Sequence, residues 1–159
     1  MGHTQWLNEE EMRAWMAFIP ASTLVARELD QQLKEDSGLS HLQYEILIHL
    51  NGAENGALRM TELAERLINS KSGLTYQIGQ MEKAGLVTRR KCEWSGSGVL
   101  AEITDTGRTA LEGAAPGHVE KVREIFIDVL TPEERKAIAD ALGRVRDRIV
   151  ERNEGGTCW

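Results

Sequence analysis

Apolar side chains recur at helical intervals in the first part of the chain and predict one long helix over about residues 8–34. Asn8 is placed to cap its first turn, with Glu11 at the reciprocal position of a capping box. Pro20 lies inside the pattern, so we expect a kink or a split there, because proline cannot donate a helical hydrogen bond. The apolar positions of this segment are Trp15, Ile19, Leu29 and Leu33.

Three shorter helices are predicted next. Ser40 and Gln43 form a second capping-box pair, at the start of a helix that ends before the glycine-containing segment 52–56. A helix of about two turns is expected over residues 60–67, and another from Ser70 to about residue 84, where Gly85 ends it. The last of these has one apolar face at i, i+4, i+7 spacing and one free face; its apolar residues are Leu74, Ile78 and Met81.

Alternation replaces helical spacing over residues 86–91 and 99–104, which predicts two short antiparallel strands joined by the serine- and glycine-rich segment 92–98. Two further helices are expected, one beginning near Thr104 and one at Thr131. The second has a threonine cap, Pro132 as its first residue and Glu134 at the capping-box position.

A short helix, a turn, a second helix with a free face and a hairpin form a winged helix-turn-helix. We therefore predict a mainly α fold with a small β-wing, flanked by N- and C-terminal dimerisation helices. In a helix-turn-helix the second helix enters the major groove of DNA and the first crosses the backbone.

The charge of the chain is unevenly distributed. The net charge of −6 over 159 residues, taken as a whole, disfavours a nucleic-acid partner. Between Arg59 and Lys91, however, there are seven basic and only three acidic residues, which gives +4 in this window and −10 in the remainder. Because the basic window covers the helix pair and the first strand of the hairpin, charge and pattern both indicate double-stranded DNA as the partner.

The candidate DNA contacts follow from this fold. Base reading could come from Ser72, Thr75, Tyr76 or Gln77, and an amide is suited to adenine. The basic residues of the hairpin are expected to contact phosphates. Trp94 would either pack on a sugar edge or be an exposed indole that makes no such contact. The predicted contacts of the recognition helix are Ser70, Lys71, Ser72, Gly73, Thr75, Tyr76, Gln77 and Gln80. Those of the wing are Arg89, Arg90, Lys91 and Trp94.

The final helix has a narrow apolar stripe, typical of a packing seam between helices rather than of a broad core face. Its residues are Ile138, Leu142, Val145 and Ile149. Together with the apolar positions of the first helix, this stripe would leave apolar surface exposed on a monomer, so we predict a homodimer. A twofold dimer also pairs two recognition helices about one DNA turn apart.

The chain from about Trp15 to Arg152 resembles the MarR family of winged-helix transcription regulators. The segments that carry the resemblance are 39–50, 60–67, 70–75, 81–90 and 103–108. The resemblance implies a dimer that binds a near-palindromic operator, usually represses, and is often released by a small aromatic or lipophilic ligand. It divides the chain into an N-terminal dimerisation helix (1–37), a DNA-binding region (38–104), C-terminal dimerisation helices (105–152) and a flexible tail (153–159).

The resemblance also places a ligand pocket between the first helix, the helix after Ser40 and the helix after Thr104. The candidate lining residues are Trp15, Phe18, Ile19, His41, Tyr44 and His49. The wing departs from the family pattern, because the Asp-x-Arg usual at its tip is replaced by Ser95 and Ser97.

Other classes of protein receive less support. The sequence contains no nucleophile elbow and no phosphate-binding glycine loop, so we expect neither an enzyme nor a cofactor. His41 and His49 lie roughly 12 Å apart along a helix, too far to share a metal ion. No apolar run is long enough for a membrane span, and with two cysteines we expect a cytoplasmic protein.

Three alternatives to a regulator that is released by a ligand stay open. Cys92, beside Arg90 and Lys91, would suit a redox-responsive regulator, because neighbouring positive charge favours the reactive thiolate. The same fold could also serve a regulator that needs no ligand. It could, finally, serve a winged-helix adaptor whose acidic body binds a basic protein.

Overall fold

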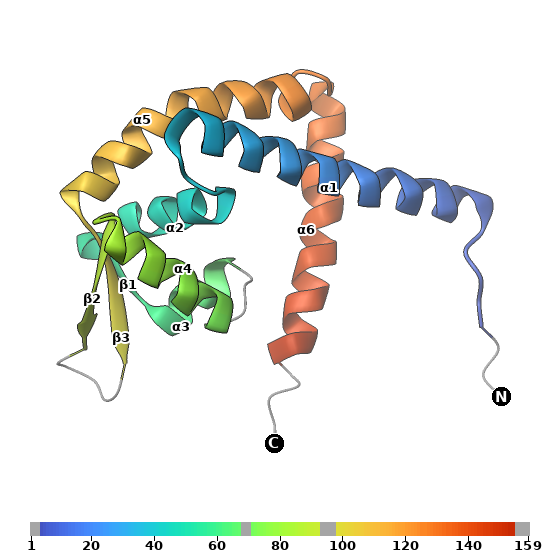
Figure 1. The fold of residues 1–159 in the computed structure, drawn as a ribbon. Coiled ribbons are helices and arrows are strands. Elements are labelled where there is room, and N and C mark those ends of the chain that lie inside the picture. Colours follow the sequence, from blue (N-terminus) through green and yellow to red (C-terminus); the bar gives the residue numbers. More distant parts are fainter. Residues whose placement is uncertain (1–3, 68–70, 93–97, 155–159) are drawn as a thin grey trace. The chain divides into compact units, whose positions relative to one another are not determined.

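The computed structural model describes residues 4–67, 71–92 and 98–154 (Figure 1). The chain divides into two compact units, residues 1–121 and 122–159. The first unit holds most of the secondary structure, in the order α1 (Glu9–Ser37), α2 (His41–Asn51), the single 3₁₀ turn η1 (Glu54–Gly56), β1 (Ala57–Arg59), α3 (Met60–Leu67), α4 (Lys71–Lys83), β2 (Val87–Lys91), β3 (Val99–Ile103) and α5 (Asp105–Val122). The predicted class, mainly α with a small β-wing, is confirmed.

Helices α1 and α2 begin where their capping boxes predict. The Asn8 side chain accepts from the backbone N–H of Glu11, and the Glu11 carboxylate accepts in return from the backbone N–H of Asn8. Ser40 and Gln43 make the same reciprocal pair at the start of α2. Helix α4 ends as predicted at Gly85, whose φ of 76° favours glycine.

The sheet has three strands, one more than predicted, in the order β1-β3-β2 and antiparallel throughout. Val87 pairs with Ile103 and Lys91 with Val99, so β2 and β3 form the expected hairpin. The additional strand, β1, pairs Leu58 with Ala101. It has only three residues, too few for an alternating pattern to stand out in the sequence.

One hydrophobic core joins these elements. The predicted apolar face of α4, formed by Leu74, Ile78 and Met81, is completely buried in it. The other elements contribute Leu33 from α1, Ile46, Leu47 and Leu50 from α2, Leu63 from α3, Val87 from β2, Ala101 and Ile103 from β3, and Leu111 from α5. The core therefore fixes α4 against the sheet and leaves its opposite face available.

Helix α1 is continuous through Pro20, so of the two predicted alternatives, a kink or a split, the split is wrong. The fixed φ of proline fits a helix, and its ring removes only one helical hydrogen bond. Every described residue from Thr4 to Leu24 is exposed, and in this helix only Leu29 and Leu33 are buried. In Figure 1 the first half of α1 extends beyond α2–α5, whereas its second half lies beside α5. There Lys121 of α5 forms an ion pair with Glu28 at 3.8 Å between Nζ and Oε2.

The second unit contains a π-helical turn, η2 (Arg123–Ile127), and the helix α6 (Pro132–Glu154). The predicted capping box at Thr131 and Glu134 is present, with hydrogen bonds of 2.8 and 3.2 Å. The Arg135 guanidinium donates to the carbonyl oxygens of Ile127 and Leu130 and so ties the turn to the helix. No helix in the described part of the chain has both the length and the apolar character required to cross a membrane.

Candidate nucleic-acid interface

Helix α4 presents a polar face opposite its buried side. Tyr76 is 64% exposed and Thr75 is also exposed, whereas Gly73, Gln77 and Gln80 are half-buried. These five predicted contacts therefore lie on or beside the accessible face of one helix. Of the remaining three, Ser70 lies outside the described residues, as do the side chains of Lys71 and Ser72.

Gln77 is connected to a different helix. The Nε2 of Gln43, on α2, donates to the Oε1 of Gln77 at 3.2 Å. The Oε1 of Gln43 accepts at the same time from the backbone N–H of Ser40 at 3.1 Å. The predicted base-contacting amide is thus already held by a residue that the sequence pattern identified only as a helix cap.

The two arginines of the wing strand are also engaged within the fold. Arg89 donates to Glu82 from its backbone N–H, Nε and Nη2 at 3.0, 3.2 and 3.2 Å. Arg90 donates from Nε to the Oε2 of Glu102 on β3 at 2.9 Å. The prediction that these side chains contact phosphates remains untested, but any such contact must share them with carboxylates.

Glu82 connects the recognition helix to the wing, because it belongs to α4 and its partner Arg89 belongs to β2. The hydrogen bonds from Arg89 lower the pKa of Glu82, and Glu82 in turn raises the pKa of Arg89. Both groups therefore stay charged at neutral pH. The pair links the end of α4 to β2.

Lys91 has a different environment from the arginines. It is exposed and, within the described ranges, has no ion-pair or hydrogen-bond partner for its ammonium. A lysine at the end of a strand beside the wing tip is well placed for a phosphate contact. Trp94 lies outside the described residues, together with Ser95 and Ser97.

Cys92 lies at the base of the wing and is half-buried. The Nη2 of Arg59, on β1, lies 3.7 Å from its Sγ. The neighbouring positive charge is therefore a guanidinium brought from another strand, in addition to the two basic residues before Cys92 in the sequence.

Comparisons with known proteins identify the family to which the chain belongs. A family model described as the MarR family matches residues 37–93. Sco3205, a MarR family transcriptional regulator from Streptomyces coelicolor whose crystal structure contains DNA, is 37% identical, with a TM-score of 0.88 and 91% of both chains covered. The chain belongs to the MarR family. AbsC, a MarR family regulator from the same organism, is 36% identical, with a TM-score of 0.87 over 92% of this chain and 98% of AbsC.

A curated relative, the HTH-type transcriptional repressor YetL of Bacillus subtilis, is 30% identical over 112 residues, which cover 70% of this chain and 66% of YetL. As a member of the MarR family, the protein is a winged-helix transcription regulator that binds DNA. That the polar face of α4 and the β2–β3 wing make the DNA contacts stays a prediction.

The six predicted pocket residues of this MarR-family chain fall into two groups. Trp15, Phe18 and Ile19 are exposed on α1, where the rings of Trp15 and Phe18 lie 6.5 Å apart. His41 and Tyr44 lie on α2, where Tyr44 is buried and His41 and His49 are half-buried. Whether both groups line one pocket stays a prediction.

A residue that the sequence did not suggest joins the second group. His118 of α5 lies 4.4 Å from Tyr44 and 5.7 Å from His41 between ring centroids. Burial, and to a smaller extent His41, lowers the pKa of His118, and burial raises the pKa of Tyr44. Nothing in the local sequence indicates this contact, because it joins helices that are distant along the chain.

Helix α1 holds this group in place through Asp30. The Asp30 Oδ1 accepts from the backbone N–H of His41 at 3.0 Å, and its Oδ2 pairs with the Lys34 ammonium. The Lys34 ammonium and then the His41 N–H lower the pKa of Asp30. Across the ranges that the structure covers, no three histidine, cysteine, aspartate or glutamate side chains gather closely enough to hold a metal ion.

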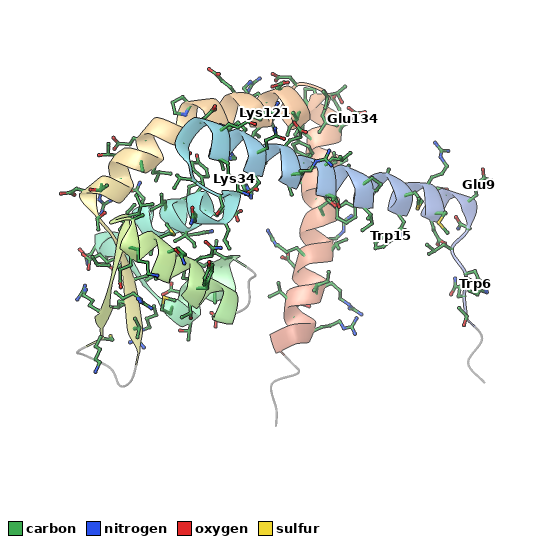
Figure 2. All side chains as sticks on the ribbon, in the orientation of Figure 1. Trp6, Glu9, Trp15, Lys34, Lys121 and Glu134 are labelled. Carbon is green, nitrogen blue, oxygen red and sulfur yellow. The ribbon has the colours of Figure 1, made fainter. Side chains whose placement is uncertain are left out.

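The predicted dimerisation stripe of this MarR-family chain lies on α6. Leu142, Val145 and Ile149 are exposed and Ile138 is half-buried. Trp15 lies on the part of α1 that extends beyond α2–α5, well away from the end that carries Lys34 (Figure 2). Both helices predicted to mediate dimerisation therefore carry large apolar side chains that are exposed in the protomer.

Proposed function

We propose that the protein is a homodimeric, sequence-specific repressor that binds a near-palindromic operator. The observation that carries the proposal is the polar face of α4, which is fixed by a buried apolar face and linked to the wing through Glu82 and Arg89. Two such elements related by a twofold axis would read two half-sites. Repression is supported by the similarity to YetL, which is a transcriptional repressor.

Self-association is supported by the exposed apolar side chains of α1. Met12, Trp15, Met16 and Ile19 follow i, i+3, i+4, i+7 spacing, and each is at least 39% exposed. A contiguous apolar stripe of this size on a soluble helix is typical of an interface. The second unit likewise has an exposed apolar stripe, on α6.

Release by a small aromatic or lipophilic ligand is the regulatory part of the proposal. Its support is the group formed by His41, Tyr44 and His118, where polar and aromatic side chains meet at the contact between α2 and α5. The Nδ1 of His118 and the Oε1 of Gln32 are buried, and neither has a hydrogen-bond partner among the described residues. Such atoms are suited to orient a ligand that carries a polar group.

The decisive experiment is selection of operator fragments from the genomic DNA of the host, followed by footprinting. We expect a protected near-palindrome of roughly two helical turns. With about four phosphate contacts per subunit, the log–log dependence of affinity on salt should have a slope near −7. A protein-binding adaptor would give no footprint, which would overturn the proposal.

The regulatory part is tested on the same operator with benzoate, phenol and indole as probes. We expect at least one of them to lower operator affinity for the wild type and to have a smaller effect on the His118→Gln variant. Equal operator affinity with and without all three probes would contradict the predicted ligand class.

A further inference from the structure

We propose that Gln43 is a positioning residue for DNA recognition. Through one hydrogen bond it fixes the amide of Gln77 so that the recognition helix presents an N–H donor to the operator. The proposal rests on the proposed function, because it assigns a role within the same DNA interface. It is carried by a chain of hydrogen bonds that begins at the first turn of α2 and ends on α4.

This series of hydrogen bonds begins at the backbone N–H of Ser40, a group that can only donate. The backbone N–H of Ser40 donates to the Oε1 of Gln43 at 3.1 Å, and the Ser40 Oγ accepts from the backbone N–H of Gln43 at 3.1 Å. Because a backbone N–H cannot accept, the amide oxygen of Gln43 must face it. The amide nitrogen of Gln43 is then directed away from the cap.

The next step fixes the second amide. The Nε2 of Gln43 donates to the Oε1 of Gln77 at 3.2 Å. An amide nitrogen only donates, so the oxygen of Gln77 must face Gln43 and its NH₂ group is left for other partners. In the described part of the chain, no hydrogen bond engages that NH₂ group. The capping box of α2 thus determines which end of Gln77 is free.

Gln77 lies at the border of the exposed face of α4. It is half-buried, between the buried Ile78 on one side and the exposed Tyr76 on the other. A free NH₂ group pairs with base-edge acceptors in the major groove, namely N7 or O6 of guanine, N7 of adenine and O4 of thymine. A bidentate contact with adenine needs both ends of the amide, and the structure already engages one of them.

Gln43→Glu separates the two roles of this side chain, which are to cap α2 and to donate to Gln77. Glutamate is equally suited to the capping box, so the start of α2 is kept. Its carboxylate cannot donate, however, so the amide of Gln77 must turn to donate to it and present its oxygen instead. The preference at the operator position read by Gln77 should then move away from guanine and thymine, whose major-groove edges offer acceptors, towards cytosine, whose edge offers only the N4 donor; adenine, which offers both, should be tolerated by both proteins.

Gln77→Glu provides an independent route to the same outcome. Its carboxylate still accepts from the Nε2 of Gln43, and its second oxygen presents an acceptor where the wild type presents a donor. In selections from random-sequence DNA, both variants should shift the same position in each half-site of the preferred site. Affinity for the wild-type operator should fall about tenfold. In a Gln77→Ala background, Gln43→Glu should cause no further change.

Several outcomes would contradict this role for Gln43. An unchanged preferred site for both variants would overturn it, as would a uniform loss of affinity for all sequences, which would indicate a phosphate contact or charge repulsion. An effect of Gln43→Glu that persists without Gln77 would also overturn it. If the wild type itself selects no site, the proposed function fails and this proposal fails with it.

Two controls keep the test interpretable. Gln31→Glu, on α1, makes the same charge change outside the DNA interface and should leave the preferred site unaltered. Circular dichroism and the thermal midpoint establish that each variant is folded. Should Gln43→Glu fail to fold, Gln43→Ala is the second variant: it leaves the Gln77 amide free to turn, so base discrimination at that position should weaken, and an unchanged preference would contradict the role of Gln43.

Discussion

Replacing Trp15 by alanine should weaken self-association strongly while leaving the fold of each protomer intact. The indole lies on the part of α1 where every residue is exposed, so its removal creates no cavity inside the protomer. In the dimer the same side chain should be covered by the second copy. The change therefore tests the interface rather than the stability of the monomer.

The magnitude follows from the exposed area. Trp15 is 53% exposed, and a tryptophan offers up to about 250 Å² for burial, so about 130 Å² remains to be covered. At about 25 cal/mol per Å² this contributes about 3 kcal/mol per protomer, or about 6 kcal/mol for the two copies of a twofold dimer. That is an upper figure, because side-chain ordering opposes it. We expect the dissociation constant to rise between about 100-fold and 10,000-fold.

Sedimentation equilibrium over a range of concentrations measures this constant directly. The wild type should sediment at twice the 17.8 kDa of one chain at micromolar concentration, and the variant should return to one chain. Tyr76→Ala is the matched control, since it removes a similarly exposed aromatic side chain from α4, which should affect DNA binding alone. A wild type that sediments as a monomer, or equal shifts for the two variants, would refute the argument.

Three further predictions concern the protomer and its DNA contacts. Gly107→Ala should lower the free energy of unfolding by about 3 kcal/mol or more, because a Cβ there meets the backbone carbonyl oxygen of Leu86, just before β2. Gly113→Ala, in open space on the same helix, should stabilise by up to about 1 kcal/mol in the same denaturation assay. The pKa of His118 is lowered on folding from its ordinary 6.5, so the unfolded chain takes up the proton first and stability should fall as pH drops through and below 6.5. His118→Gln should flatten this dependence between pH 7.5 and 5.5 in chemical denaturation; an unchanged slope would contradict it. Lys91→Ala should reduce the salt slope of operator binding by about 1.8 per dimer, whereas Lys136→Ala, on α6, should leave it unchanged.

The parts of the fold that could be predicted from the sequence are those set by neighbours along the chain. The capping residues Asn8, Ser40 and Thr131 each act on a residue three positions later, so their pairs are visible in the sequence. The buried face of α4 follows from helical spacing for the same reason. The three-residue strand β1 was not predicted, because its pairing depends on β3, far along the chain.

The site shows the same division. Tyr76 and Lys91 are accessible as expected, since the exposure of a helix face or strand end follows from its local pattern. The partners Glu82 and Glu102 of the wing arginines, and the approach of His118 to Tyr44, depend on how separate elements pack. Residue type alone indicates positive charge at Arg89, but only the packing shows that a carboxylate already shares it.

Because helix α1 is unbroken, its length fixes the angle about its axis between the side chains at its two ends. Leu29 and Leu33 anchor one end in the core, and the stripe that includes Trp15 lies at the other end of the same unbroken helix. A helix advances about 100° per residue, so one inserted residue between Val25 and Leu29 would rotate the stripe by that angle about the helix axis relative to the anchored end. An insertion of four residues would bring the stripe to within about 40° of its original direction, and one of seven to within about 20°. The number of residues in this segment therefore determines the direction in which the stripe faces, and with it the relative orientation of two protomers in any dimer that uses α1.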